Sequence, residues 1–117
     1  MRAKEGSALI ETCYSYTQTQ AKVIEKIVDL DKVAINHIVL PPGDRLPRHD
    51  SNSNVYLIVV SGALTLGLGG QEPHRYTEGS IAGIRMGVTM DVMNKDEGAL
   101  ELFVVKTPGP RSFGGGK

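Results

Sequence analysis

His49 is the side chain of this sequence best suited to proton transfer, since an imidazole titrates near neutral pH and serves as general acid or base without a metal. Asp50 follows it directly, but neighbouring side chains of an extended chain point to opposite faces. A carboxylate that orients the ring must therefore arrive through the fold, from Asp44 or Asp91. His49 is thus a candidate proton carrier for metal-independent isomerase or lyase chemistry.

The other potentially reactive side chains give weaker support for a catalytic or ligand-binding role. Cys13 is the single cysteine, so an internal disulfide is impossible, and no His or Lys stands beside it to activate the thiol. We expect His74 at the surface and His37 as a packed polar residue rather than a ligand. Arg45 and Arg48 are able to hold a carboxylate bidentately, although ordinary surface roles are favoured for both.

The elements that must position these residues are short strands. From about residue 22 onward, apolar and β-branched runs alternate with clusters of Gly, Pro, Asn, Asp and Ser, which is typical of antiparallel strands joined by turns. The predicted strands are Lys22–Val28, Val33–Leu40, Val55–Val60, Ala63–Leu68, Glu72–Tyr76, Ser80–Ile84, Thr89–Met93 and Leu100–Val105. In Leu9–Gln20, Thr and Tyr alternate with a period of two, which favours an extended strand over a helix. The fold class is therefore all-β.

Length and charge exclude several classes of protein. The 117 residues suit one domain, and the 13 basic and 13 acidic residues are interspersed, so no nucleic-acid partner is expected. The apolar runs have the length of strands, far below the roughly 20 residues of a membrane-spanning helix, so no membrane partner is expected either. No signal-peptide pattern begins the chain, so the expected location is the cytoplasm.

Val55–Val60 is apolar on both faces, which indicates that something covers each side of this strand. If Tyr56, Ile58 and Val60 were all exposed, they would form an apolar patch uncommon on monomers. A homodimer formed through this outer face is the expected explanation.

Two spacings resemble the motifs of the cupin family. The first motif, G-x5-H-x-H-x3-E-x6-G, is matched in spacing by Gly43, His49, Ser51, Val55 and Gly62. The second, G-x5-P-x-G-x2-H-x3-N, is matched by Gly79, Arg85, Gly87, Met90 and Asn94. The resemblance covers about residues 33–108 and implies a cupin double-stranded β-helix, a jelly-roll barrel. We accordingly expect an N-terminal extended arm over 1–20, the barrel over 21–110 and a Gly-rich tail over 111–117.

The resemblance also implies where a cupin would bind its metal, and most of those positions are changed. His49 is retained, but Ser51 replaces the second His, Val55 the Glu and Met90 the last His. Hydroxyl, alkyl and thioether groups are poor ligands for iron, manganese or zinc. No metal or other cofactor is expected, and a soft-metal site formed by His49 and Met90 is the weaker alternative.

With the family's geometry, these positions line a largely apolar pocket inside the barrel. The residues expected to bind a ligand are His49, Ser51, Asn54, Val55, Leu57, Arg85 and Met90, with Asn52 as a further amide contact. The favoured function is a metal-free sensor, carrier or accessory protein that binds a small molecule, and an anion contacted by His49 or Arg85 is one candidate. An enzyme, or a barrel filled by its own side chains, remains the alternative.

Overall fold

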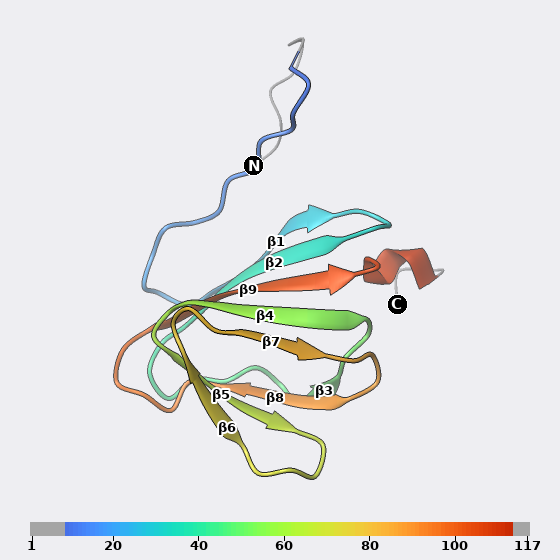
Figure 1. The fold of residues 1–117 in the computed structure, drawn as a ribbon. Coiled ribbons are helices and arrows are strands. Elements are labelled where there is room, and N and C mark those ends of the chain that lie inside the picture. Colours follow the sequence, from blue (N-terminus) through green and yellow to red (C-terminus); the bar gives the residue numbers. More distant parts are fainter. Residues whose placement is uncertain (1–8, 114–117) are drawn as a thin grey trace.

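The computed structural model describes residues 9–113, which form nine strands and one short 3-10 helix (Figure 1). The strands are β1 (Val23–Asp29), β2 (Ala34–Leu40), β3 (His49–Asp50), β4 (Asn54–Ser61), β5 (Ala63–Leu68), β6 (His74–Thr77), β7 (Ile81–Ile84), β8 (Thr89–Met93) and β9 (Leu100–Thr107). The helix η1 (Pro110–Phe113) follows β9. Residues 1–8 of the expected arm and 114–117 of the expected tail lie outside the described residues.

Two antiparallel sheets face each other across the core (Figure 1). One has five strands in the order β1-β2-β9-β4-β7, and the other has four in the order β3-β8-β5-β6. The all-β prediction is confirmed, and every predicted strand from residue 22 onward is present with ends within one or two residues of those expected. β3 was not predicted because a two-residue strand carries no periodic signal.

The N-terminal arm, from residue 9 to residue 20, is extended but pairs with no strand. The prediction of a strand in this segment was therefore wrong, because alternation of Thr and Tyr specifies an extended chain without supplying a partner edge. In Figure 1 the arm runs across the end of the five-stranded sheet and then away from the barrel.

The core lies between the sheets, on the faces that strand alternation turns inward. Its largest fully buried apolar side chains are Leu40, Leu57, Leu64, Leu66, Leu100 and Leu102. Along β9, Leu100 pairs with Leu40 and Leu102 with Val59, so this end of the barrel is filled by leucine and valine. At the other end of β9, the inward positions are Val104 and Lys106.

The turn glycines that the sequence places between strands adopt the left-handed conformation. Gly43, Gly62, Gly79 and Gly87 have φ between 81° and 92°. Gly62 is restricted further, because a Cβ atom there would overlap the backbone carbonyl oxygen of Ala99. The β4–β5 turn therefore requires glycine for both conformation and space.

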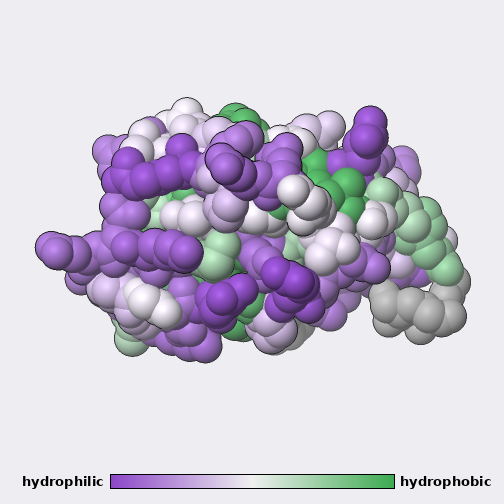
Figure 2. Space-filling model, turned by 90° about the horizontal axis from the view of Figure 1, so that it is seen from below, coloured by the Kyte–Doolittle hydropathy of each residue, from purple (hydrophilic) through white to green (hydrophobic). Residues whose placement is uncertain are grey.

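The outer face of the four-stranded sheet is polar (Figure 2). Asp91 on β8 points outward, and its carboxylate accepts hydrogen bonds from Arg45 at 2.9 Å and Arg48 at 2.9 Å. Arg48, then Arg45, hold the pKa of Asp91 below its usual range, against the opposing effect of desolvation. The two arginines thus bind an internal carboxylate rather than line a pocket entrance.

The outer face of the five-stranded sheet is more apolar. Tyr56 is 45% exposed, Val60 44% and Ile81 66%, and the register pairs Ile81 with Ile58 on the adjacent strand. Inward Val55, Leu57 and Val59 are buried, so β4 is apolar on both faces as the sequence indicates. Within residues 9–113, no helix is long and apolar enough to cross a membrane.

Candidate functional site

A cavity of about 130 Å³ occupies the less filled end of the barrel. Its walls come from both sheets and are mostly apolar. The lining residues are Ile24, Asn36, Ile38, Leu46, His49, Ser51, Asn52, Val55, Leu57, Met90, Val92, Val104 and Lys106. Five of the seven predicted ligand-binding residues are therefore together here: His49, Ser51, Val55, Leu57 and Met90.

His49 lies at the exposed rim of this cavity, on the two-residue strand β3. It pairs across the ladder with Met90 of β8, so the first and last of the implied metal-ligand positions are direct neighbours. The ring Nδ1 is 2.9 Å from the carbonyl oxygen of Pro47. A carbonyl only accepts, so Nδ1 carries the hydrogen, and in the neutral ring Nε2 is left with a lone pair.

The carboxylates that the sequence offered as partners for His49 are bound elsewhere. Asp91 holds the two arginines on the outer face. Asp44 forms an ion pair with Lys22 at 3.1 Å, and Lys22, with the Arg45 backbone N–H, lowers the pKa of Asp44. The orientation of His49 therefore comes from a backbone carbonyl rather than from a carboxylate.

Ser51 lines the cavity but its hydroxyl is committed to the backbone. Its Oγ donates to the carbonyl oxygen of Arg85 at 2.7 Å and accepts from the Val88 N–H at 3.1 Å. The residue is buried, at 4% exposure. Ser51 thus ties the segment between β3 and β4 to the β7–β8 turn, and this role accounts for the hydroxyl without a ligand.

Asn54 and Arg85 lie away from the cavity, contrary to their expected place in it. Both border a separate, shallow recess on the outer face, together with Tyr56 and Gly83. The reason is strand alternation: Val55 and Ile84 point inward, so the residues next to them point outward. The Asn54 side-chain oxygen accepts the Met86 backbone N–H at 3.0 Å, which holds the β7–β8 turn.

The cavity contains two polar residues that the sequence reasoning missed, Asn36 and Lys106. The inward direction of both side chains follows from the alternation of side chains along the strand, extended by two residues from a known inward position. Inward Ile38 on β2 implies inward Asn36, and inward Val104 on β9 implies inward Lys106. The position of Lys106 in the cavity was not predicted because the predicted strand ends at Val105, whereas β9 continues to Thr107.

The side chains at the cupin metal positions do not fit a metal ion. The Ser51 hydroxyl is used by the backbone, Val55 has no donor atom, and the Met90 thioether is a soft ligand. Within residues 9–113, no three His, Cys, Asp or Glu side chains are grouped so that they could hold a metal.

Comparisons with known proteins give one relative of high identity. An uncharacterised protein of Methanocaldococcus jannaschii is 46% identical over 106 residues, which is 90% of this chain and 91% of the relative. The crystal structure of that protein, described as an RmlC-like cupin with a double-stranded β-helix fold, matches with a TM-score of 0.87 over 91% of this chain and 98% of that one.

More distant structures share the fold alone. A double-stranded β-helix protein of Klebsiella pneumoniae matches with a TM-score of 0.70 at 18% identity, over 82% of this chain and 84% of that one. A cupin superfamily protein of Desulfitobacterium hafniense matches with a TM-score of 0.68 at 8% identity, over 80% and 83%. No family model matches the sequence.

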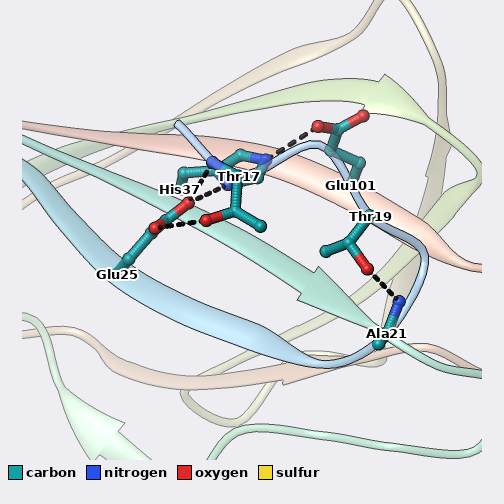
Figure 3. Close-up of polar contacts among 6 residues, drawn as sticks. All are labelled: Thr17, Thr19, Ala21, Glu25, His37 and Glu101. Atoms are coloured by element: carbon teal, nitrogen blue, oxygen red, sulfur yellow. Dashed lines mark hydrogen bonds and ion pairs between the residues drawn. The ribbon is translucent and has the colours of Figure 1, made fainter. Parts of the chain in front are cut away.

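A second polar cluster lies on the outer face of the five-stranded sheet (Figure 3). His37 is fully buried, with Nδ1 at 2.8 Å from Glu25 and Nε2 at 2.7 Å from Glu101. Its ring packs between Tyr16 of the arm, at 4.7 Å between centroids, and Phe103, at 4.9 Å. The expectation that His37 is a packed polar residue is confirmed.

This cluster fastens the arm to the barrel through charge. An ionised carboxylate only accepts hydrogen bonds, so two carboxylates on one imidazole require hydrogen on both ring nitrogens and a positive ring. Glu25 also accepts the Thr17 backbone N–H at 2.8 Å and its hydroxyl at 3.0 Å. The Thr17 N–H, followed by His37, holds the pKa of Glu25 below its usual value, although desolvation opposes this.

We predict that Glu25→Gln loosens the arm at neutral pH, because an amide loses the charge-assisted hydrogen bonds. In NMR spectra, the chemical shifts of the Tyr16 ring protons should move most of the way from their folded-state values toward those of an unstructured peptide. The lowered pKa means that Glu25 stabilises the arm at neutral pH, and that this contribution is lost as pH falls through the folded-state pKa. The wild type should therefore show the same movement on acidification.

Glu78→Gln, at an exposed position of the β6–β7 turn, is the matched control and should leave the Tyr16 resonances in place. Folded-state Tyr16 shifts in the E25Q variant would contradict the proposed fastening.

Proposed function

The chain belongs to the cupin family, and we propose that it is a metal-free binding protein that holds a small, partly apolar organic molecule in the open end of its barrel. It would act as a sensor, carrier or accessory protein. The observation that carries the proposal is the cavity itself. It lies among His49, Ser51, Val55 and Met90, where the family resemblance places a ligand, and these side chains suit an organic molecule better than a metal.

The size of the cavity supports a small ligand. An apolar cavity of about 150 Å³, known from an engineered protein, is large enough to bind benzene. At about 130 Å³, this one is slightly smaller. A compact group of four or five non-hydrogen atoms fits, whereas a sugar ring or a nucleotide base does not fit wholly inside.

The arrangement of the walls supports a ligand with one polar end. Leu57, Val92 and Val104 form apolar wall, while His49 and Asn52 stand at the exposed rim. Such a site orients a ligand by a few hydrogen bonds at one end and removes apolar surface from water at the other. A barrel filled by its own side chains would have no such space.

An enzyme is the second candidate, and one observation favours it. The Nδ1 bond of His49 to Pro47 leaves Nε2 as an acceptor at the rim of the cavity. A neutral imidazole held in this tautomer is suited to remove a proton from a bound ligand, as an isomerase or lyase requires. If so, His49→Ala should lower turnover more than it lowers ligand affinity.

A homodimer is proposed on the basis of the outer face of β4 and β7. Tyr56, Val60 and Ile81 remain substantially exposed there, and Ile58 lies between them. A second copy packed on this face in two-fold symmetry would cover the same residues on both subunits. The polar outer face of the other sheet offers no equivalent surface (Figure 2).

We predict that a thermal-shift screen of small organic compounds finds one chemical class that stabilises the protein. At about 100 times its Kd, a ligand adds about 2.7 kcal/mol, which corresponds to a rise of several degrees in Tm. The rise should shrink in His49→Ala and vanish in Val104→Phe, which fills the cavity. His74→Ala, an exposed histidine of β6, is the control and should respond like the wild type.

Two results would count against this function. One is the absence of a response to a broad library, and the other is equal stabilisation of the Val104→Phe variant. In the same preparation, about one equivalent of iron, manganese, zinc or copper retained after dialysis would contradict the metal-free part of the proposal.

We further predict that Ile81→Lys converts a dimer to a monomer in sedimentation-velocity experiments at micromolar concentration. Placing an ammonium group in an apolar interface of about 1,200 Å² or more carries a large desolvation cost. Met86→Lys changes another exposed apolar residue, which lies in the β7–β8 turn rather than on β4 or β7, and should leave the dimer intact. A monomeric wild type would refute the proposed interface.

A further inference from the structure

The apolar cavity adjoins a second, polar recess of similar size, about 130 Å³. Asn36, Asn52 and Lys106 line both spaces, so the two meet at these side chains. The recess is also bordered by Lys26, Asp29, Ala34, Pro110 and Arg111. A ligand at the junction would therefore have an apolar chamber on one side and a charged one on the other.

Lys106 is unusual among the cations of the described residues. It points inward from β9, is half-buried, and lines an otherwise largely apolar cavity. None of the ion pairs found within residues 9–113 involves Lys106 or Lys26. Arg111, by contrast, already pairs with Asp31 at 3.1 Å and donates to the Asp29 carbonyl oxygen at 2.7 Å.

The surroundings of Lys106 disfavour its positive charge. Burial lowers the pKa of its ammonium group, and the neighbouring Lys26 lowers it further. Both effects would be offset by an anion placed between the two lysines, since an opposite charge within a few ångströms stabilises the protonated form. Asp29 is the one acidic residue that lines the recess, and within residues 9–113 it forms no ion pair with either lysine, so the junction can accept a further negative group.

We propose, building on the binding function above, that the ligand is a small monocarboxylate with a branched aliphatic tail, whose carboxylate lies between Lys106 and Lys26 and whose tail fills the apolar cavity. Asn36 and Asn52 add amide N–H donors at the same junction. Hydrogen bonds from charged donors to a carboxylate are among the stronger ones in proteins, particularly where water is partly excluded.

The charge balance favours a monoanion. Lys26 and Lys106 carry two positive charges, Asp29 contributes one negative charge, and Arg111 is offset by Asp31. The recess therefore has one net positive charge available, which a carboxylate neutralises and a dianionic phosphate exceeds. The tail is limited by volume, because the cavity of about 130 Å³ is slightly smaller than the roughly 150 Å³ that accommodates benzene, and a tail of about four carbon atoms fits within it.

The test compares two probes of equal shape by isothermal titration calorimetry, 3-methylbutanoate and its neutral amide, 3-methylbutanamide. The wild type should bind the acid at least about tenfold more tightly, because only the acid pairs with the lysines. High salt should narrow this difference, since the recess is partly open to solvent.

The variants assign the effect to particular residues. Lys106→Met keeps the long side chain without its charge, and should remove the preference for the acid while changing amide affinity by less than about threefold. Lys26→Met should reduce the preference partially. Lys32→Met, an exposed lysine of the β1–β2 turn that borders neither space, is the control and should bind both probes like the wild type.

The outcomes separate this inference from the function on which it rests. Equal affinity for acid and amide, or an acid preference that survives Lys106→Met, would overturn the carboxylate assignment while leaving the cavity as a binding site. Failure of both probes to bind wild-type protein would overturn the branched monocarboxylate class. Failure of the metabolite screen as well would remove the binding function itself.

Discussion

The alternation of inward and outward side chains along each strand is the constraint on which the rest of this structure depends. On β9 it turns Leu100, Leu102, Val104 and Lys106 into the barrel in succession. The first two meet Leu40 and Val59 and fill one end. At the other end, the side chains that include Lys106 do not fill the interior, and a cavity is present there. One register therefore determines both the core and the candidate site.

The same constraint explains how the barrel accommodates other side chains at the positions where the family resemblance implies metal ligands. Val55 and Met90 belong to the apolar core, at 2% and 3% exposure, so they contribute to stability where a buried Glu and His would need a metal or another polar partner. Ser51 keeps a polar atom at its position, but uses it to join backbone segments that are 34 and 37 residues away in sequence. These positions are thus structural parts of the barrel, and a cavity of about 130 Å³ lies beside them.

Much of the fold follows from the sequence, because period-two patterns and turn glycines are local signals. The strands, the positive φ of Gly62 and the inward direction of Val55 and Leu57 are all of this kind. What the sequence did not reveal is which face of some strands points inward and which distant segments come into contact. Arg85 matched a motif spacing yet follows inward Ile84, so it points away from the cavity. In the Glu25–His37–Glu101 cluster, Glu25 is 12 positions and Glu101 is 64 positions from His37 in sequence. No local sequence pattern predicts this contact.

The difference between the filled end and the hollow end of the barrel is open to direct measurement. Methyl NMR spectra under xenon pressure test it most directly, since xenon enters dry apolar cavities of this size. We predict shifts that saturate with pressure at Val55, Leu57 and Val104, and little change at Leu64 and Leu102. Absent shifts, or equal shifts at both ends, would contradict the existence of a distinct binding cavity.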